Sequence, residues 1–371
     1  MRIVLIGPVP PFRGGIAHYT SQLSFALAAA GHDLLVISFK RQYPRWLFPG
    51  ASDRDPSLQQ IETIQAEFWL DSLNPLSWFT TFNRIRRLKP DILILPWWTV
   101  FWGPPWFVLG ALNRYFGASD LVMLCHNVLP HDSRAWQQIV TKLVFRWTDR
   151  FVVQSPAELD RLVGLLPYAE VSVAPLPVYQ IFPKPDLDKR AAKKNLGIEP
   201  SRPVLLFFGI VRPYKGLDIL LAAMPEVRKA FPKVLLVVAG EFWGDPARYQ
   251  AHIQNLDIEE AVRIDNRYIP NEEVALLFAA ADLVVAPYRR VTGSGVIQLA
   301  KGFGVPIVAS GTTTQDTEVL TVPAEDPPAL AAGIVCSLQS PFASHMAGDN
   351  SGWERLVDML VGDVKPTRQS E

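Results

Sequence analysis

Short apolar segments alternate with amphipathic segments along almost the whole of this chain. The apolar runs have the length of strands, and the segments between them repeat apolar residues at helical spacing. Parallel strands need a crossover connection, which is usually a helix, so the alternation predicts a doubly wound parallel sheet. The strands predicted in the first half are residues 2–7, 34–38, 61–64, 91–95, 121–125, 150–153 and 171–174.

The alternation is interrupted by a proline-rich stretch from Pro175 to Pro185 and then starts again. A chain of 371 residues is also longer than one hydrophobic core usually supports. We therefore predict an α/β protein with two Rossmann-like domains facing a central cleft. The predicted parts are a domain at 1–178, a linker at 179–186, a domain at 187–340, and a C-terminal helix within 341–371 that packs back toward the first domain.

Composition narrows the class of protein. The formal net charge is +0, so global charge gives no attraction to nucleic acid. Cys125 and Cys336 have apolar neighbours, which favours reduced thiols in the cytoplasm. No secretory signal is evident at the start. The uncharged segment 92–113 is long enough to span a bilayer, but Pro96 and Pro104 interrupt any helix there. We expect a cytoplasmic protein that could contact the inner face of the membrane.

Two cations follow the first predicted strand of the second domain. Arg212 and Lys215 lie where a helix is expected to begin, and cations oppose the helix dipole at that end unless an anion is bound. Gly293, Ser294 and Gly295 precede another predicted helix, and glycines let a backbone approach phosphate closely. These segments predict a binding site for a nucleotide diphosphate, to which the Thr292 and Ser294 hydroxyls could contribute.

Other loop residues are candidates for the same ligand. Gly14 and Gly15 follow the first strand. They are interpreted either as a second phosphate-binding loop or as a plain tight turn. His126 and His131 flank another loop, and a zinc site would need more ligands. We predict that His126 binds substrate and that Glu241, after strand 234–239, contacts the ligand. His131 is assigned to the acceptor side or to a surface loop.

An aromatic cluster lies within the uncharged segment. Core packing would account for part of it, and an acceptor groove or a membrane contact for the rest, because tryptophan favours membrane interfaces. Its predicted acceptor-side or membrane-side residues are Trp97, Trp98 and Trp102. The two D-x-D pairs, at 53–55 and 186–188, lie in irregular polar segments and are interpreted as solvated charge, so no metal site is predicted.

Together these motifs resemble the family 4 glycosyltransferases, which have the GT-B fold. The resemblance covers nearly the whole chain. It is carried by the Gly-Gly loop at 14–15, HNVLPH at 126–131, FFGIVRPYKGLDILL at 207–221, AGEFWGD at 239–245, RYIPNEEVALLFAAADLVVAPYR at 267–289, SGVIQLAKGFGVPIVAS at 294–310, and the terminal helix with Trp353.

The resemblance implies an activity. It is retaining, metal-independent transfer of a hexose from a nucleotide-diphosphate sugar, without a bound cofactor. Arg212 and Lys215 would then neutralise the leaving diphosphate, the backbone near Gly295 and Val296 would bind its distal phosphate, and His126 would face the donor sugar. The implied acceptor is a glycan or a lipid-linked molecule in cell-surface polysaccharide biosynthesis, and no nucleic acid is implied as a partner.

The chain also departs from the family pattern. Many relatives carry two glutamates in the last motif, where this chain has Val291 and Leu299. The donor base and sugar therefore do not follow from that motif. Two alternatives stay open at this point: a nucleotide-sugar epimerase on the same fold, and a non-catalytic member that binds the nucleotide sugar without turnover.

Overall fold

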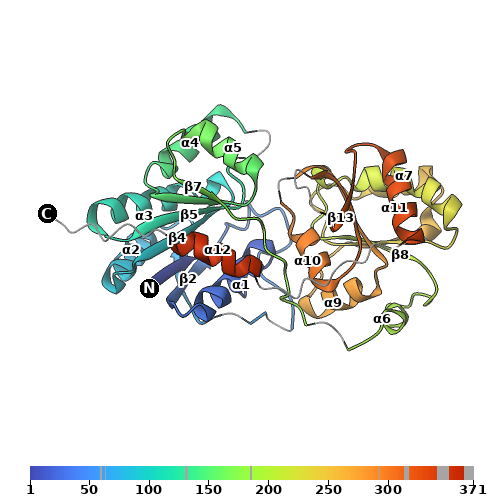
Figure 1. Ribbon diagram of the computed structural model, residues 1–371, viewed down its shortest axis with the longest axis horizontal. Coiled ribbons are helices and arrows are strands. Elements are labelled where there is room, and N and C mark those ends of the chain that lie inside the picture. The colour runs from blue at the N-terminus through green and yellow to red at the C-terminus, as the bar shows by residue number, and fades with distance from the viewer. Residues whose placement is uncertain are drawn as a thin grey trace. The chain divides into compact units, whose positions relative to one another are not determined.

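The computed structural model describes residues 1–58, 61–62, 64–129, 133–183, 186–291, 293–312, 317–340 and 351–362. The chain forms two compact units (Figure 1). Unit 1 contains the described residues of Met1–Asp55, Ile61–Pro177 and Asn350–Glu371, and unit 2 contains those of Pro56–Gln60 and Val178–Asp349. Both units are α/β folds with parallel sheets, as the alternation predicts.

Unit 1 is built on a seven-stranded sheet in the order β3-β2-β1-β4-β5-β6-β7, with every pair of neighbours parallel. The chain starts in the middle of the sheet, runs to one edge and then crosses back to the other. The strands are β1 (Arg2–Ile6), β2 (Asp33–Arg41), β3 (Ala66–Asp71), β4 (Ile92–Trp97), β5 (Asp120–Cys125), β6 (Arg150–Val153) and β7 (Val171–Val173).

The strand predicted at 61–64 is wrong. The described residues 61, 62 and 64 are not in a strand, and β3 begins at Ala66 instead. β3 lies at the edge of the sheet and is only partly buried, with the mixed sequence AEFWLD. An edge strand does not need a continuous apolar run. The pattern of apolar residues in the sequence therefore did not predict the position of β3 correctly.

Helices cover both faces of the unit 1 sheet. One group consists of α2 (Pro75–Leu88), α3 (Gly103–Phe116) and α4 (Ala135–Phe145), in which each helix contacts the next. On the other side α1 (Gly15–Ala29) lies beside the C-terminal α12 (Ser351–Val361) (Figure 1). The remaining helices are a short 3-10 turn, η1 (Val100–Trp102), and α5 (Pro156–Leu165). The last helix of the chain thus packs on the first.

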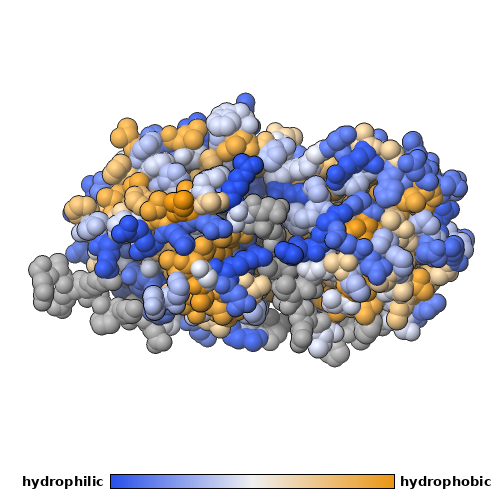
Figure 2. Space-filling model, turned by 90° about the horizontal axis from the view of Figure 1, so that it is seen from above, coloured by the Kyte–Doolittle hydropathy of each residue, from blue (hydrophilic) through white to orange (hydrophobic). Residues whose placement is uncertain are grey.

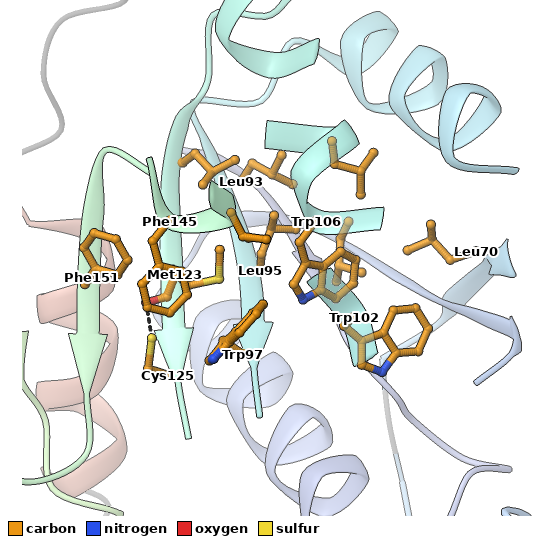
Figure 3. Packing of buried hydrophobic residues seen from close by; sticks show 14 of the residues in the cluster. Leu70, Leu93, Leu95, Trp97, Trp102, Trp106, Met123, Cys125, Phe145 and Phe151 are labelled. Carbon is orange, nitrogen blue, oxygen red and sulfur yellow. Dashed lines mark hydrogen bonds between the residues drawn. The ribbon is translucent and has the colours of Figure 1, made fainter. Parts of the chain in front are cut away.

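The aromatic cluster belongs to the core of unit 1. Trp97 and Trp102 are 1% and 0% exposed. Trp97 packs against Phe145 of α4, and Trp102 lies beside Trp106 of α3 (Figure 3). Trp102 stacks on Trp106 with ring centroids 5.2 Å apart. The assignment of Trp97 and Trp102 to an acceptor or membrane side is therefore wrong. Burying a large apolar ring removes it from water, and this stabilises the folded chain.

Unit 2 repeats the architecture with a six-stranded parallel sheet in the order β10-β9-β8-β11-β12-β13. The strands are β8 (Val204–Phe208), β9 (Leu235–Ala239), β10 (Val262–Asp265), β11 (Leu283–Val291), β12 (Ile307–Thr312) and β13 (Val319–Val322). The helices are α6 (Lys189–Asn195), η2 (Pro213–Lys215), α7 (Leu217–Ala230), α8 (Ala247–Asn255), η3 (Glu259–Ala261), α9 (Asn271–Ala280), α10 (Gly295–Phe303) and α11 (Pro327–Gln339).

The strand order of unit 2 determines which loops meet. β8 lies between β9 and β11 in the sheet. β9 and β10 lie on one side of β8, and β11, β12 and β13 lie on the other. Connections leave β8 and β11 toward opposite edges of the sheet, which makes their carboxyl ends a topological switch point. The two loops predicted to bind diphosphate follow these two strands, and the loop after β9 is the next neighbour.

Candidate active site

Two cations lie in the loop that follows β8. Arg212 is half-buried and Lys215 is only 9% exposed. An ideal Cβ placed on Gly209 would lie 3.1 Å from Lys215 Nζ and 3.5 Å from Val296 Cγ2. Lys215 and the first turn of α10 therefore share one small volume at the carboxyl edge of the sheet, as predicted from their loops.

Strand β11 holds this loop in place. The Arg289 guanidinium donates to the Pro213 carbonyl and forms an ion pair of 2.6 Å with Asp218 in the first turn of α7. Gly216 ends the loop with a φ of 68°, and a Cβ there would lie 1.9 Å from the Pro287 carbonyl oxygen. Arg289 was not predicted, because its partner Asp218 lies 71 positions away in the chain.

Ser294 is the capping residue at the N-terminus of α10. Its Oγ accepts a hydrogen bond from Ile297 N–H at 3.4 Å and lies 3.1 Å from the buried Tyr288 hydroxyl. The N–H groups of Gly295 and Val296 belong to the first turn, whose donors have no intrahelical acceptor. A helix start beside two cations is an arrangement that suits a phosphate group.

The loop after β9 contacts the loop that carries Arg212. Val211 N–H donates to the Glu241 carbonyl at 2.9 Å, and Trp243 N–H donates back to the Val211 carbonyl at 3.0 Å. The Arg212 guanidinium lies over the Trp243 ring, 4.0 Å from its centroid. The Glu241 carboxylate accepts from Trp243 Nε1 at 2.9 Å. A ligand contact by Glu241 stays a prediction, and sequence reasoning missed Trp243.

The Lys215 environment predicts how binding depends on pH. Burial, followed by the nearby charge of Arg212, lowers the pKa of Lys215 from 10.5 to about 8. A bound diphosphate favours the ammonium form, so it raises this pKa. We expect affinity for a nucleoside diphosphate to fall as pH rises through about 8, and binding near that pH to take up protons.

Calorimetry in two buffers of different ionisation enthalpy measures this uptake. The control is Lys215→Met, which removes the titrating group and is expected to bind more weakly without a step near that pH. A wild type whose affinity shows no change across this pH range would contradict a role for Lys215 in binding the diphosphate.

In unit 1, His126 follows β5 and is half-buried, and the Tyr19 ring meets it edge-on with ring centroids 4.6 Å apart. The Gln154 amide donates to His126 Nδ1 at 3.1 Å, which leaves the ring proton on Nε2. Nε2 is buried and has no hydrogen-bond partner within the described ranges. Burial lowers the His126 pKa to about 4. The neutral ring can donate a hydrogen bond to a hydroxyl group but carries no positive charge.

The loop that begins at His126 is anchored by a buried acid that sequence reasoning missed. Glu158 is 1% exposed, and its Oε2 accepts from Val128 N–H at 2.6 Å. The same carboxylate pairs with Arg161 at 2.5 Å. Glu158 is the fourth residue of a motif, S-P-A-E, that reads as an ordinary helix start. Its contact with a distant loop was therefore not foreseen.

Of the remaining predicted residues, three are described by the structure and two are not. Gly14 has a φ of 101°, and a Cβ on Gly14 or Gly15 would have no atom within 4 Å, so this backbone faces open space within unit 1. Trp98 is half-buried and donates from Nε1 to the Tyr43 hydroxyl at 2.8 Å. Thr292 and His131 lie outside the described residues, and their roles stay predictions.

No group of three or more His, Cys, Asp or Glu side chains in the described residues could hold a metal ion. None of the helices in them is both long enough and apolar enough to span a membrane.

Family models match both units. Residues 13–179 match the model described as Glycosyltransferase Family 4, and residues 202–340 match the model described as Glycosyl transferases group 1. Together the two matches include most of the described strands and all the loops discussed above. They do not include the terminal helix α12.

Individual relatives are similar to this chain over different parts of its length. A D-inositol 3-phosphate glycosyltransferase of Segniliparus rotundus is 39% identical over 126 residues, which are 33% of this chain and 28% of that enzyme. The chain thus matches well under two thirds of that relative. A GDP-mannose-dependent alpha-(1-6)-phosphatidylinositol monomannoside mannosyltransferase of Mycolicibacterium smegmatis is 27% identical over 97% of this chain and 98% of that enzyme.

A solved structure supports the fold independently. Sucrose-phosphate synthase from Thermosynechococcus elongatus superposes with a TM-score of 0.68 and 20% identity, covering 97% of this chain and 94% of that chain. At this identity the likeness concerns the fold alone. With two parallel doubly wound units and family matches on both, the chain belongs to the family 4 glycosyltransferases with the GT-B fold.

Proposed function

We propose that this glycosyltransferase moves a hexose from a nucleotide-diphosphate donor to a lipid-linked or glycan acceptor, with retention at the anomeric carbon. The observation that carries the proposal is the buried Lys215 beside Arg212 and the start of α10. No described carboxylate is among the groups that shift the pKa of Lys215. Such a concentration of positive charge suits a ligand that brings its own negative charges.

The chemistry of the proposal follows from the leaving group. The acceptor hydroxyl attacks the anomeric carbon on the face that the diphosphate leaves, and the bond from that carbon to the phosphate oxygen breaks. The departing oxygen takes the proton of the acceptor. Negative charge develops on the diphosphate, where Arg212, Lys215 and the N–H groups of α10 would stabilise it. Neither a side-chain base nor a metal ion is needed in this scheme.

The donor is proposed to be GDP-mannose, which appears in the name of the full-length mycobacterial relative. The family resemblance implies a glutamate at the position of Leu299, which is 5% exposed in α10. It provides no carboxylate for the ribose, so another group would have to accept those hydroxyls.

A thermal-shift panel of UDP, GDP, ADP and their sugars tests the donor, because a ligand that binds only the folded state raises the melting temperature. We expect GDP and GDP-mannose to give the largest shifts. Product analysis with and without acceptor then separates transfer from epimerisation, and EDTA should leave the rate unchanged. Release of an epimerised nucleotide sugar without acceptor would contradict the proposed transfer.

A lipid-linked acceptor would require contact with a membrane, and α3 and α4 offer a suitable face. Trp136, Ile139 and Leu143 are 52%, 59% and 44% exposed, and their spacing places them on one side of α4. Tyr115 and Phe116 at the end of α3 are 71% and 61% exposed. Figure 2 shows hydrophobic residues among hydrophilic ones on the side of unit 1 that carries α4 in Figure 1.

The charged residues of α3, of α4 and of the two caps of α4 are all basic. Neither α3 nor α4 contains an aspartate or glutamate. The basic residues on or next to them are Arg114, Arg134, Lys142 and Arg146. Exposed aromatic and aliphatic side chains with flanking cations favour the interface of an anionic membrane. We therefore place the proposed membrane contact on α3 and α4 rather than on the buried tryptophans.

Vesicle flotation tests this surface. Lys142→Glu with Arg146→Glu is expected to weaken binding to phosphatidylglycerol-containing vesicles by at least about 30-fold, at about 1 kcal/mol for each charge. The variant should still bind the nucleotide. Leu76→Ser with Phe79→Ser, which changes exposed apolar residues of α2, is the control and should float like the wild type. Equal flotation of all three proteins would contradict the assignment of this face.

A further inference from the structure

Arg212 is supported by a ring that belongs to a different loop. Its guanidinium carbon lies 4.0 Å from the centroid of Trp243, which is van der Waals contact. Such stacking engages the flat face of the guanidinium, whereas its N–H donors lie in the plane. A stacked arginine can therefore keep its donors directed at a phosphate while its long side chain loses rotamer freedom to the ring.

The Trp243 ring is itself fixed at two points. Its Nε1–H donates to the Glu241 carboxylate at 2.9 Å. Its backbone is set by the parallel bridge between Val211 and Phe242, and Phe242 N–H donates to Asn266 Oδ1 at 2.9 Å. The bridge places Trp243 next to Arg212 in register, so the stack follows from the pairing of the two loops.

We propose that Trp243, held by Glu241, is a positioning residue that directs Arg212 at the diphosphate of the donor; this inference rests on the proposed function. The carboxylate keeps the indole in one orientation, and the indole keeps the guanidinium over its face. Trp243 acts on the reaction only through Arg212. Replacing the ring should therefore matter as long as Arg212 is present and should have no effect when it is absent.

The geometry is tested without any substrate. In protein labelled on arginine, the side-chain protons of Arg212 are expected to shift upfield in the NMR spectrum, because they lie over an aromatic face. The shift should persist in Trp243→Phe and disappear in Trp243→Leu. Glu241→Ala should move the Trp243 Nε1–H resonance. An Arg212 signal at the same position in the wild type and in Trp243→Leu would overturn the inference.

The function of the stack is tested by kinetics. Trp243→Leu is expected to lower kcat/KM for GDP-mannose about tenfold, and Trp243→Phe by no more than about threefold, because a ring face remains. In an Arg212→Ala background, Trp243→Leu should cause no further loss. Trp46→Leu, a change of the same kind at a residue that is 80% exposed in unit 1, is the control.

The outcomes separate this inference from the proposed function. An active wild type with an equal loss from Trp243→Leu in both backgrounds overturns the positioning role and leaves the proposed function standing. A wild type that transfers no sugar from any donor of the panel contradicts the proposed function. Inorganic pyrophosphate then replaces the donor. Weaker pyrophosphate binding by Trp243→Leu only when Arg212 is present supports the positioning role, and unchanged binding overturns it.

Discussion

Alanine in place of both Arg212 and Lys215 is expected to lower kcat for sugar transfer by about 10⁴-fold, since a single preorganised donor is usually worth 10²- to 10³-fold. The effect should be large because Lys215 is buried, so its charge acts in a region of low dielectric constant. The two side chains would stabilise charge that develops only as the diphosphate leaves. Their loss should therefore appear in kcat as well as in nucleotide binding.

A steady-state assay with the donor found in the thermal-shift panel measures this effect. The matched control is Arg190→Ala with Lys229→Ala, which removes the same charge from exposed positions on α6 and α7. The control should retain the wild-type rate. A double variant of Arg212 and Lys215 that keeps its rate within about tenfold of the wild type would remove both residues from the catalytic machinery.

Arg150→Met is expected to destabilise unit 1 by about 3–5 kcal/mol, the usual cost of leaving one member of a buried ion pair without its partner. Arg150 and Asp120 are 7% and 6% exposed and lie 2.7 Å apart. Arg150 also donates to the carbonyls of Met359 and Leu360 at 3.4 and 3.1 Å. It thus neutralises the negative end of the α12 dipole while it pairs with Asp120.

Chemical unfolding and hydrogen exchange measure the two parts of this loss. We expect faster exchange in α12 of the Arg150→Met variant. The control is Arg150→Met with Asp120→Leu, which removes both charges and should recover part of the stability, because no isolated carboxylate remains buried. Equal stability of the wild type and Arg150→Met, with unchanged exchange in α12, would contradict the anchoring role.

The docking of α12 also affects the surroundings of His126 within unit 1. Trp353 of α12 lies 5.2 Å from the Tyr19 ring, and Tyr19 lies 4.6 Å from His126. Arg150 therefore supports the surroundings of His126 through α12. A loss of activity in the Arg150→Met variant would be expected, although Arg150 belongs to unit 1 and not to the loops of unit 2 that carry Arg212 and Lys215.

Local sequence patterns predicted most elements of both sheets. Strands such as β5 and β8 are nearly continuous apolar runs, because parallel strands are covered on both faces. The loops at their carboxyl ends could be located for the same reason, since parallel strands place those ends on one edge. Arg212, Lys215 and the start of α10 were found together in this way, and the resemblance to the family came from the same loops.

The sequence by itself determined the alternation of strands and helices, the break near Pro177 and the loops that carry the cations, because these depend on residues close together in the chain. Only the tertiary structure decided that Trp97 and Trp102 are buried, since exposure depends on which helix covers a face. It also decided that Arg150 meets α12 across 210 positions and that Trp243 supports Arg212. These contacts follow from strand order and loop pairing, which bring together residues that no local pattern relates.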